Sequence, residues 1–221
     1  MKLDLHCHSS HSADCKLSVK EILKHAKKIG FEGIAITDHN EINGTLEAYE
    51  LAKDIGILVV RGIEITSRDG HILGYGTTEK VPRGLSATET LQHIQDLGGL
   101  CVAAHPLRWY TGLKKKTLKL TDFPAIEACN GRSLNSTNKK VERIASRMNK
   151  GITGGSDAHF ISEIGSGFTI IDDPCEREED VLEAIFKHKT KVGGNGRSLK
   201  MSIRYARKCV GEWFGRGMRR I

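Results

Sequence analysis

Short apolar segments that end in a histidine or an acidic residue recur along this chain, and this pattern constrains the fold more than any other feature. Five such segments end at His6 and His8, at Asp38 and His39, at Glu64, at His105, and at Asp157 and His159. A parallel barrel gathers the carboxyl ends of its strands around one mouth, so residues distant in sequence meet there. The pattern predicts one polar site at the end of a barrel, which is the layout of an enzyme.

Strand and helix patterns alternate between these segments. Strands are predicted near residues 3–5, 33–36, 57–65, 71–75, 100–104, 125–129, 152–155 and 167–171. Helices are predicted near residues 19–29, 45–55, 87–97, 136–149 and 176–188, the first and third opened by the capping boxes Ser18 with Glu21 and Ser86 with Glu89. Residues 107–122 are expected to form a basic, irregular loop. Helices that connect consecutive strands indicate a parallel sheet, hence an α/β barrel.

The length and composition fit one catalytic domain. A chain of 221 residues that is 38% hydrophobic is long enough for one core. No apolar run approaches the roughly 18 residues of a membrane-spanning helix, and Met1-Lys2 leads directly into a strand. We therefore expect a cytoplasmic protein with no transmembrane segment. The six cysteines are far apart and show no CxxC spacing, so we expect no disulfide framework.

The net charge of +7 is concentrated at the carboxyl end. Residues 1–196 carry 26 basic and 26 acidic side chains, whereas residues 197–221 carry eight basic residues and one acidic residue. We interpret 1–196 as the barrel and 197–221 as a basic amphipathic tail. The tail could bind a nucleic-acid backbone, lie on an anionic membrane, or pack its apolar side on the barrel. Packing is the commonest of these cases.

The polar residues at the strand ends have the chemistry of metal ligands. Residues two apart on a strand face the same way, so His6 and His8 present two imidazoles together, and Asp157 with His159 repeats the spacing. A single histidine in an apolar segment is more often structural than ligating, but here that explanation would have to hold at every strand end. Imidazoles and carboxylates without a thiolate cluster favour Zn, Mn or Fe in an open, catalytic site.

The motifs DLHCHS, ITDHN, GIEIT, HILGYG, AAHP and GSDAH resemble, in this order, those of the PHP (polymerase and histidinol phosphatase) family over about residues 3–170. The resemblance implies a single-domain, distorted (β/α)7 TIM-like barrel that hydrolyses phosphate esters with two to three divalent metals. The ligands that it implies are His6, His8, Asp14, His39, Glu64, His71, His105, Asp157 and His159. Asp14 stands where many relatives have histidine, which favours a harder metal such as Mn there.

Neighbouring metal ions lower the pKa of water toward about 7, which makes hydroxide available at neutral pH. We expect Asp157 to act in catalysis, and Arg108 first and Arg132 second to bind the substrate phosphate. The alternatives are an ion pair with a nearby acid for Arg108 and helix capping at the surface for Arg132. Asp38 is expected to orient a ligand imidazole through a hydrogen bond.

Three functions agree with these residues. The favoured one is a phosphoesterase acting on a small phosphorylated metabolite or a nucleotide. The second is an exonuclease acting on nucleic-acid ends, which only the basic tail supports. The third is an inactive barrel serving as a subunit of a ribonucleoprotein, against which the complete ligand set argues. The sequence leaves the phosphate ester and the oligomeric state open.

Overall fold

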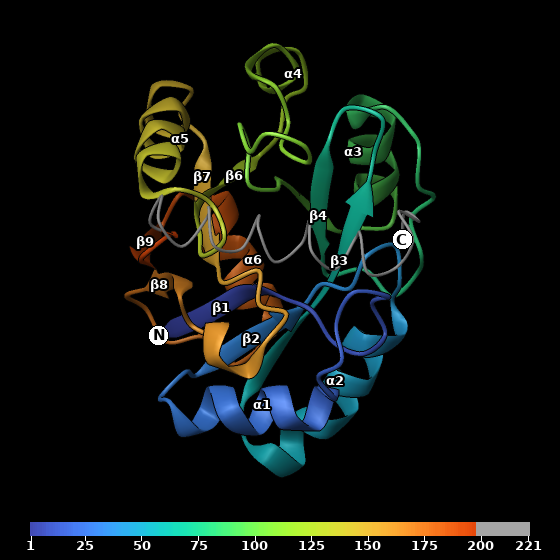
Figure 1. Ribbon diagram of the computed structural model, residues 1–221, viewed down its shortest axis with the longest axis vertical. Helices are drawn as coiled ribbons and strands as arrows, with labels where there is room; N and C mark the ends of the chain where they lie inside the picture. Colours follow the sequence, from blue (N-terminus) through green and yellow to red (C-terminus); the bar gives the residue numbers. More distant parts are fainter. Residues whose placement is uncertain (198–221) are drawn as a thin grey trace, which may run out of the picture.

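The computed structural model describes residues 1–197 and has an α/β fold with a nearly closed, barrel-shaped sheet (Figure 1). Its strands are β1 (Lys2–Cys7), β2 (Gly33–Ile36), β3 (Leu58–Thr66), β4 (His71–Tyr75), β5 (Leu100–Ala103), β6 (Ala125–Asn130), β7 (Gly151–Gly155), β8 (Gly167–Ile171) and β9 (Thr190–Gly194). Its helices are α1 (Val19–Lys28), α2 (Asn43–Ile55), α3 (Ala87–Asp96), α4 (Lys115–Leu120), α5 (Asn135–Arg147), the 3-10 helix η1 (Ile161–Glu163) and α6 (Glu178–Phe186). In Figure 1, α1 lies at the bottom of the view and α4 at the top, whereas α3 lies beside β4 and α5 beside β7. The predicted α/β barrel is confirmed.

The sheet is mixed, in the order β7-β6-β5-β4-β3-β2-β1-β8-β9. Strands β1 to β3 are parallel, and so are β5 to β7. The prediction of a parallel sheet is wrong for β4, which is antiparallel to β3 and β5, and for β8, which is antiparallel to β1 and β9. Only residues 67–70 join β3 to β4, closed by a hydrogen bond of 3.1 Å from Ser67 N to Gly70 O. A turn this short produces a hairpin.

The first and seventh strands meet without a regular ladder. Asp157 N donates to His6 O over 2.6 Å, and His8 N donates to Ala158 O over 3.1 Å. At the side of the barrel, the Thr169 side chain accepts from the backbone N of Gly154 and donates to its carbonyl oxygen. The first two bonds tie residues 6 and 8 to residues 157 and 158, and the two Thr169 bonds tie β8 to Gly154 of β7.

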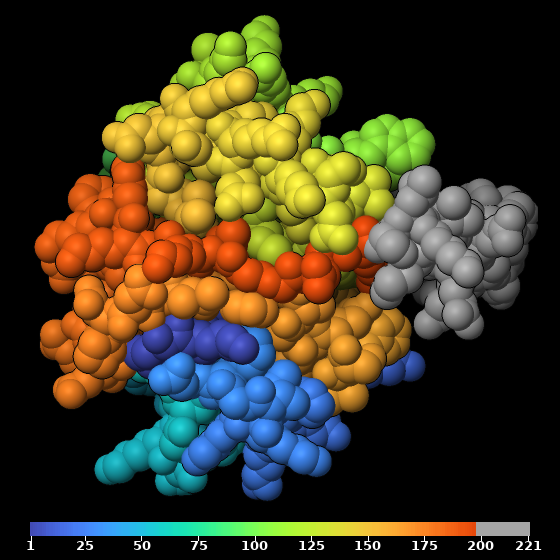
Figure 2. Space-filling view, turned by 90° about the vertical axis from the view of Figure 1, so that its left-hand side faces the viewer, coloured from blue at the N-terminus to red at the C-terminus, as the bar shows by residue number. Residues whose placement is uncertain are grey.

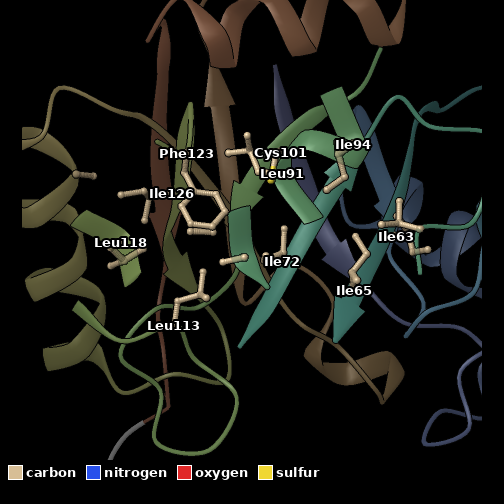
Figure 3. Close-up of a cluster of buried hydrophobic side chains, with 14 of the residues drawn as sticks. Ile63, Ile65, Ile72, Leu91, Ile94, Cys101, Leu113, Leu118, Phe123 and Ile126 are labelled. Carbon is tan, nitrogen blue, oxygen red and sulfur yellow. The ribbon is translucent and has the colours of Figure 1, made fainter. Parts of the chain in front are cut away.

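The helix-capping motifs predicted from the sequence are formed, but the predicted loop before β6 contains a helix. Both capping boxes are present, at the beginnings of α1 and α3. The prediction of an irregular loop over 107–122 is wrong for α4, because the buried Leu118 holds this helix against Leu113 and Phe123 in the core. Figure 3 shows these side chains packed together with residues from β3, β4 and α3.

Three predictions from the sequence concern membrane-spanning helices, disulfides and the carboxyl-terminal tail. No helix within residues 1–197 has the length and apolar character needed to cross a bilayer. The cysteines of this part of the chain, Cys7, Cys15, Cys101, Cys129 and Cys175, are buried and free. The predicted amphipathic tail lies outside the described residues except for Arg197. That residue donates from its backbone N to Ser133 O over 2.8 Å and pairs with Glu163.

Candidate metal centre

The nine predicted ligands converge at one end of the barrel. Their nitrogen and oxygen atoms form groups that lie within 4.8 Å of one another and have the composition of metal sites. The groups are His8, Asp14, His39 and His159; His6, Glu64 and His105; His6, His8 and Asp157; and His39, Glu64 and His71. His71 belongs with the others because it is the first residue of the antiparallel β4, paired with Thr66 at the end of β3.

Glu64 occupies the middle of this nine-residue cluster. Its Oε1 atom lies 2.7 Å from His71 Nδ1 and 2.8 Å from His105 Nε2. Its Oε2 atom lies 3.3 Å from His6 Nε2, 3.2 Å from His8 Nε2 and 3.1 Å from His39 Nδ1. Burial raises the pKa of the Glu64 carboxyl, but the surrounding imidazoles, first His39, outweigh burial and hold the pKa well below its ordinary value. A carboxylate in this position has one oxygen available for each of two neighbouring subsites.

Three buried imidazole nitrogens of the cluster have no hydrogen-bond partner within residues 1–197. They are His8 Nε2, His39 Nδ1 and His105 Nδ1. His8 Nε2 and His39 Nδ1 lie close to Glu64 Oε2, but the angles of these contacts are unsuitable for hydrogen bonds. A buried polar atom without a partner costs about 1–3 kcal/mol. Coordination would satisfy such nitrogens, so the residues present fit a group of metal ions.

A second carboxylate lies at the edge of the cluster. Asp14 Oδ2 lies 2.9 Å from His159 Nε2 and 3.6 Å from His39 Nε2. Burial raises the pKa of Asp14, but the contact with His159 and the charge of His39 lower it below its ordinary value. The Asp14 side chain is 35% exposed, which makes this subsite the one most open to solvent. The residues of this subsite come from the loops after β1, β2 and β7.

The protonation of the imidazoles follows from their neighbours. Burial lowers the pKa of His39 to about 4. For His8, burial also lowers the pKa, but Asp157 and Glu64 outweigh it and raise the pKa to about 9. Ligand imidazoles must be neutral, so metal binding at His8 would release a proton.

Both predicted phosphate-binding arginines reach the cluster. Arg108 Nη1 lies 2.5 Å from Asp157 Oδ2, and Arg132 Nη1 lies 3.4 Å from Asp157 Oδ1 and 2.8 Å from His159 Nδ1. The ion-pair alternative for Arg108 therefore holds, whereas Arg132 faces the cluster rather than capping α5 at the surface. Burial raises the pKa of Asp157, but Arg108, His6 and Arg132 outweigh burial and lower it well below its ordinary value.

Sequence reasoning missed Glu127, a buried residue of β6. Its Oε1 atom lies 2.9 Å from His6 Nδ1, and its Oε2 atom accepts from His105 N over 2.6 Å. Asn130 Nδ2 also donates to Glu127 Oε1, over 3.1 Å. The contact with Nδ1 turns His6 so that Nε2 faces Glu64, which is how carboxylates commonly orient ligand histidines. The available signal was an acid inside the apolar segment AIEACN.

Two further buried acids hold loops rather than imidazole rings. Asp38 accepts from Ser9 N over 2.7 Å and from Ser9 Oγ over 2.6 Å. The prediction that Asp38 orients a ligand imidazole is therefore wrong, since its side chain fixes the loop after β1. Asp4 accepts from Ser156 N over 2.8 Å and from Gly165 N over 2.9 Å. Burial raises the pKa of Asp4 to about 6.

A glycine lets β7 approach β1 beneath the cluster. A Cβ atom on Gly155 would lie 2.3 Å from His6 Cβ and 2.5 Å from His6 N. These distances are shorter than any real contact between such atoms, and one of the atoms belongs to the backbone. The position of the His6 imidazole therefore depends on the absence of a side chain at residue 155.

Comparisons with known proteins agree with this arrangement. The family model described as PHP domain matches residues 4–150, and the one described as PHP-associated matches residues 135–190. An uncharacterized protein of Methanocaldococcus jannaschii is 46% identical over 116 residues, 48% of this chain and 68% of its own. A second protein of that organism is 29% identical over 202 residues, 87% of this chain and 80% of its own. A 5'-3' exoribonuclease of Haemophilus influenzae is 38% identical over 99 residues, 43% of this chain and 36% of its own.

Solved structures share the fold. A two-domain protein from Bacteroides vulgatus, described as containing a predicted PHP-like metal-dependent phosphoesterase, superposes with a TM-score of 0.74 at 20% identity. The match covers 92% of this chain and 68% of that protein. A lesion-specific endonuclease from Pyrococcus furiosus superposes with a TM-score of 0.65 at 18% identity, covering 86% of this chain and 57% of its own. At such identities the likeness shows the fold alone.

Proposed function

Because this chain belongs to the PHP domain family of metal-dependent phosphoesterases, we propose that it hydrolyses the phosphate ester of a small metabolite or a nucleotide at the nine-residue cluster. The observation that carries this proposal is the set of three buried imidazole nitrogens without hydrogen-bond partners in residues 1–197. His8 Nε2 and His39 Nδ1 lie close to Glu64 Oε2, and all three rings belong to groups that have the composition of metal sites. Two to three divalent transition metals would satisfy them, with Mn, Zn or Fe as candidates.

In the proposed reaction, the oxygen of a water molecule bonds to phosphorus, the ester P–O bond breaks, and the leaving oxygen takes up a proton. Metal ions bound here would lower the pKa of water and neutralise charge on the phosphate. Arg108 and Arg132 would bind phosphate oxygens, since guanidinium groups fit these oxygens in pairs. Asp157 contacts both guanidiniums and thereby holds them at the edge of the cluster.

The proposal places the chemistry in residues 1–196, because the whole cluster lies between His6 and His159. A cytoplasmic location remains part of the proposal. The complete set of ligands argues against an inactive barrel, since an inactive scaffold would have no need of nine converging side chains. The activity of the similar exoribonuclease also supports a reaction on a phosphate ester.

Metal content tests the proposal directly. Protein purified and then reconstituted with Mn, Zn or Fe should hold two to three equivalents of metal by elemental analysis and should hydrolyse p-nitrophenyl phosphate or its bis ester. Removal of the metal by a chelator should abolish turnover, and readdition should restore it. Less than one equivalent after reconstitution would exclude the cluster as proposed.

Replacing Arg108 separates phosphate binding from metal binding. Arg108→Ala should retain its metal and lower kcat/KM by about ten- to a thousand-fold, the scale of one charged contact of ~1.5–4 kcal/mol. The matched control is Arg143→Ala, at an exposed position of α5, which should match the wild type. Steady-state kinetics and elemental analysis of both variants provide the measurement. Unchanged kinetics in Arg108→Ala would move the phosphate contact to Arg132.

A further inference from the structure

Two exposed aromatic side chains directly follow Arg108 in the chain. Trp109 is 86% exposed and Tyr110 is 83% exposed, and their ring centroids are 4.4 Å apart. They follow Arg108, whose guanidinium contacts Asp157, so the ring pair begins one residue from a side chain that reaches the proposed centre. In Figure 2, the green segment around residue 110 stands out from the surface.

The backbone of the aromatic loop is held in place. Leu107 N donates to Leu113 O over 3.1 Å, which closes the loop at its base. His71 N donates to Thr111 O over 2.8 Å, which ties the loop to β4 and the cluster. A Cβ atom on Gly112 would lie 2.4 Å from backbone, so the tight return of the chain requires glycine there. The two rings are therefore presented from a fixed base, and little ordering of the backbone would oppose ligand binding.

Basic residues flank the two rings in the sequence. Arg108 lies before them, and the exposed Lys114, Lys115 and Lys116 follow the loop. Flat exposed rings among cations are the pattern that binds single-stranded nucleotides, because bases stack on the rings while the cations attract the phosphates. A binding site for a protein partner would be expected to have a larger apolar patch. Among residues 1–197, the exposed apolar residues Tyr49 and Phe186 lie elsewhere, on α2 and α6.

From these observations we propose that Trp109 and Tyr110 form a stacking surface for a nucleobase of the substrate. The inference rests on the proposed phosphoesterase function and narrows it. The esters cleaved here carry a nucleobase within about one nucleotide of the scissile phosphate. Free nucleotides and the ends of single strands both carry a nucleobase next to a phosphate. Comparing the rates of hydrolysis of the two kinds of substrate distinguishes between them.

Substrates that differ only in the base test this proposal. The wild type should hydrolyse adenosine 5'-monophosphate with a kcat/KM about five- to a hundred-fold higher than that for ribose 5-phosphate, the scale of stacking on one base. The kcat/KM for a 5'-phosphorylated tetradeoxynucleotide should likewise exceed that for the same strand with an abasic first nucleotide. In the double variant Trp109→Ala/Tyr110→Ala, both ratios should fall to about one.

The matched control is Phe186→Ala, which removes an exposed ring from α6 beside the amino ends of β6 and β7, opposite the cluster. This variant should keep the wild-type ratios. Preference for the strand over the free nucleotide would identify a nucleic-acid end as the source of the base. Equal rates with and without the base in the wild type, or ratios that survive the double substitution, would overturn the stacking surface.

A binding measurement separates failure of this inference from failure of the proposed function. The chain has two tryptophans, so Trp213→Phe leaves Trp109 as the only one. Adenosine 5'-monophosphate or the strand should quench its fluorescence, whereas ribose 5-phosphate and the abasic strand should not. Quenching without hydrolysis of any ester would support the surface and reject the activity. Absence of quenching by base-bearing ligands would reject the surface whether or not the protein hydrolyses esters.

Discussion

Glu64→Gln should lose most of its bound metal and lower kcat/KM by about three orders of magnitude, since metal ions supply several kcal/mol of stabilisation to such reactions. The carboxylate lies within 3.3 Å of nitrogen atoms from five histidines. An amide of the same shape has no charge and only one acceptor oxygen, so it cannot serve two subsites. Elemental analysis and steady-state kinetics on reconstituted protein provide the measurement.

The control for this substitution is Glu47→Gln. Glu47 also contacts a histidine, at 2.9 Å from His11, but its side chain is 44% exposed. This variant should keep both its metal and its turnover. Full metal content and full activity in Glu64→Gln, with circular dichroism unchanged in both variants, would refute the central role of the carboxylate.

Gly155→Ala should destabilise the protein and disturb the cluster at the same time. The added methyl group would lie 2.3 Å from His6 Cβ and 2.5 Å from His6 N, so β1 and β7 must separate. Overpacking typically costs about 1–3 kcal/mol, and a clash with backbone belongs at the upper end. For a chain of this size the Tm should fall by roughly 6–12 °C. Metal content should fall with it, because His6 is displaced.

Gly98→Ala is the matched control. Gly98 has a φ of 75°, but no atom lies within 4 Å of an added Cβ. The substitution should cost only the roughly 1–2 kcal/mol of the left-handed conformation, and metal content should be unaffected. Thermal unfolding and elemental analysis of both variants separate general strain from damage to the cluster. Wild-type behaviour of Gly155→Ala would show that β1 and β7 are not in close contact.

The sequence predicted the barrel, and the reason is geometrical. The carboxyl ends of parallel strands share one mouth whatever the details of packing, so the residues that follow these strands can be grouped without knowledge of the strand partners. The spacing of His6 and His8 adds a second local signal, because residues two apart share a face. The nine side chains do converge, although their role as ligands remains a prediction.

The reversal of β4 follows from the turn over residues 67–70, which has no room for a helix. No helix was predicted there, but the alternation along the rest of the chain led to the prediction of a parallel sheet. The other features that the sequence did not reveal depend on long-range pairing. Glu127 lies on β6, where every residue is buried, so the pattern did not distinguish the inside of the barrel from the outside. Asp38 follows β2 like a ligand, but its partner Ser9 comes from another loop. Neither choice of partner is encoded in local periodicity.

The meeting of β1 with residues 154–158 has a consequence for the biosynthesis of the protein. Among the nine residues of the cluster, His6 and His8 leave the ribosome first, but the hydrogen bond from Asp157 N to His6 O requires about 150 further residues. At roughly 5–20 residues per second, this delay lasts roughly 8–30 s. Throughout that time the nascent chain carries histidines without the carboxylate of Asp157. Loading of the proposed metal centre would therefore follow translation of nearly the whole barrel.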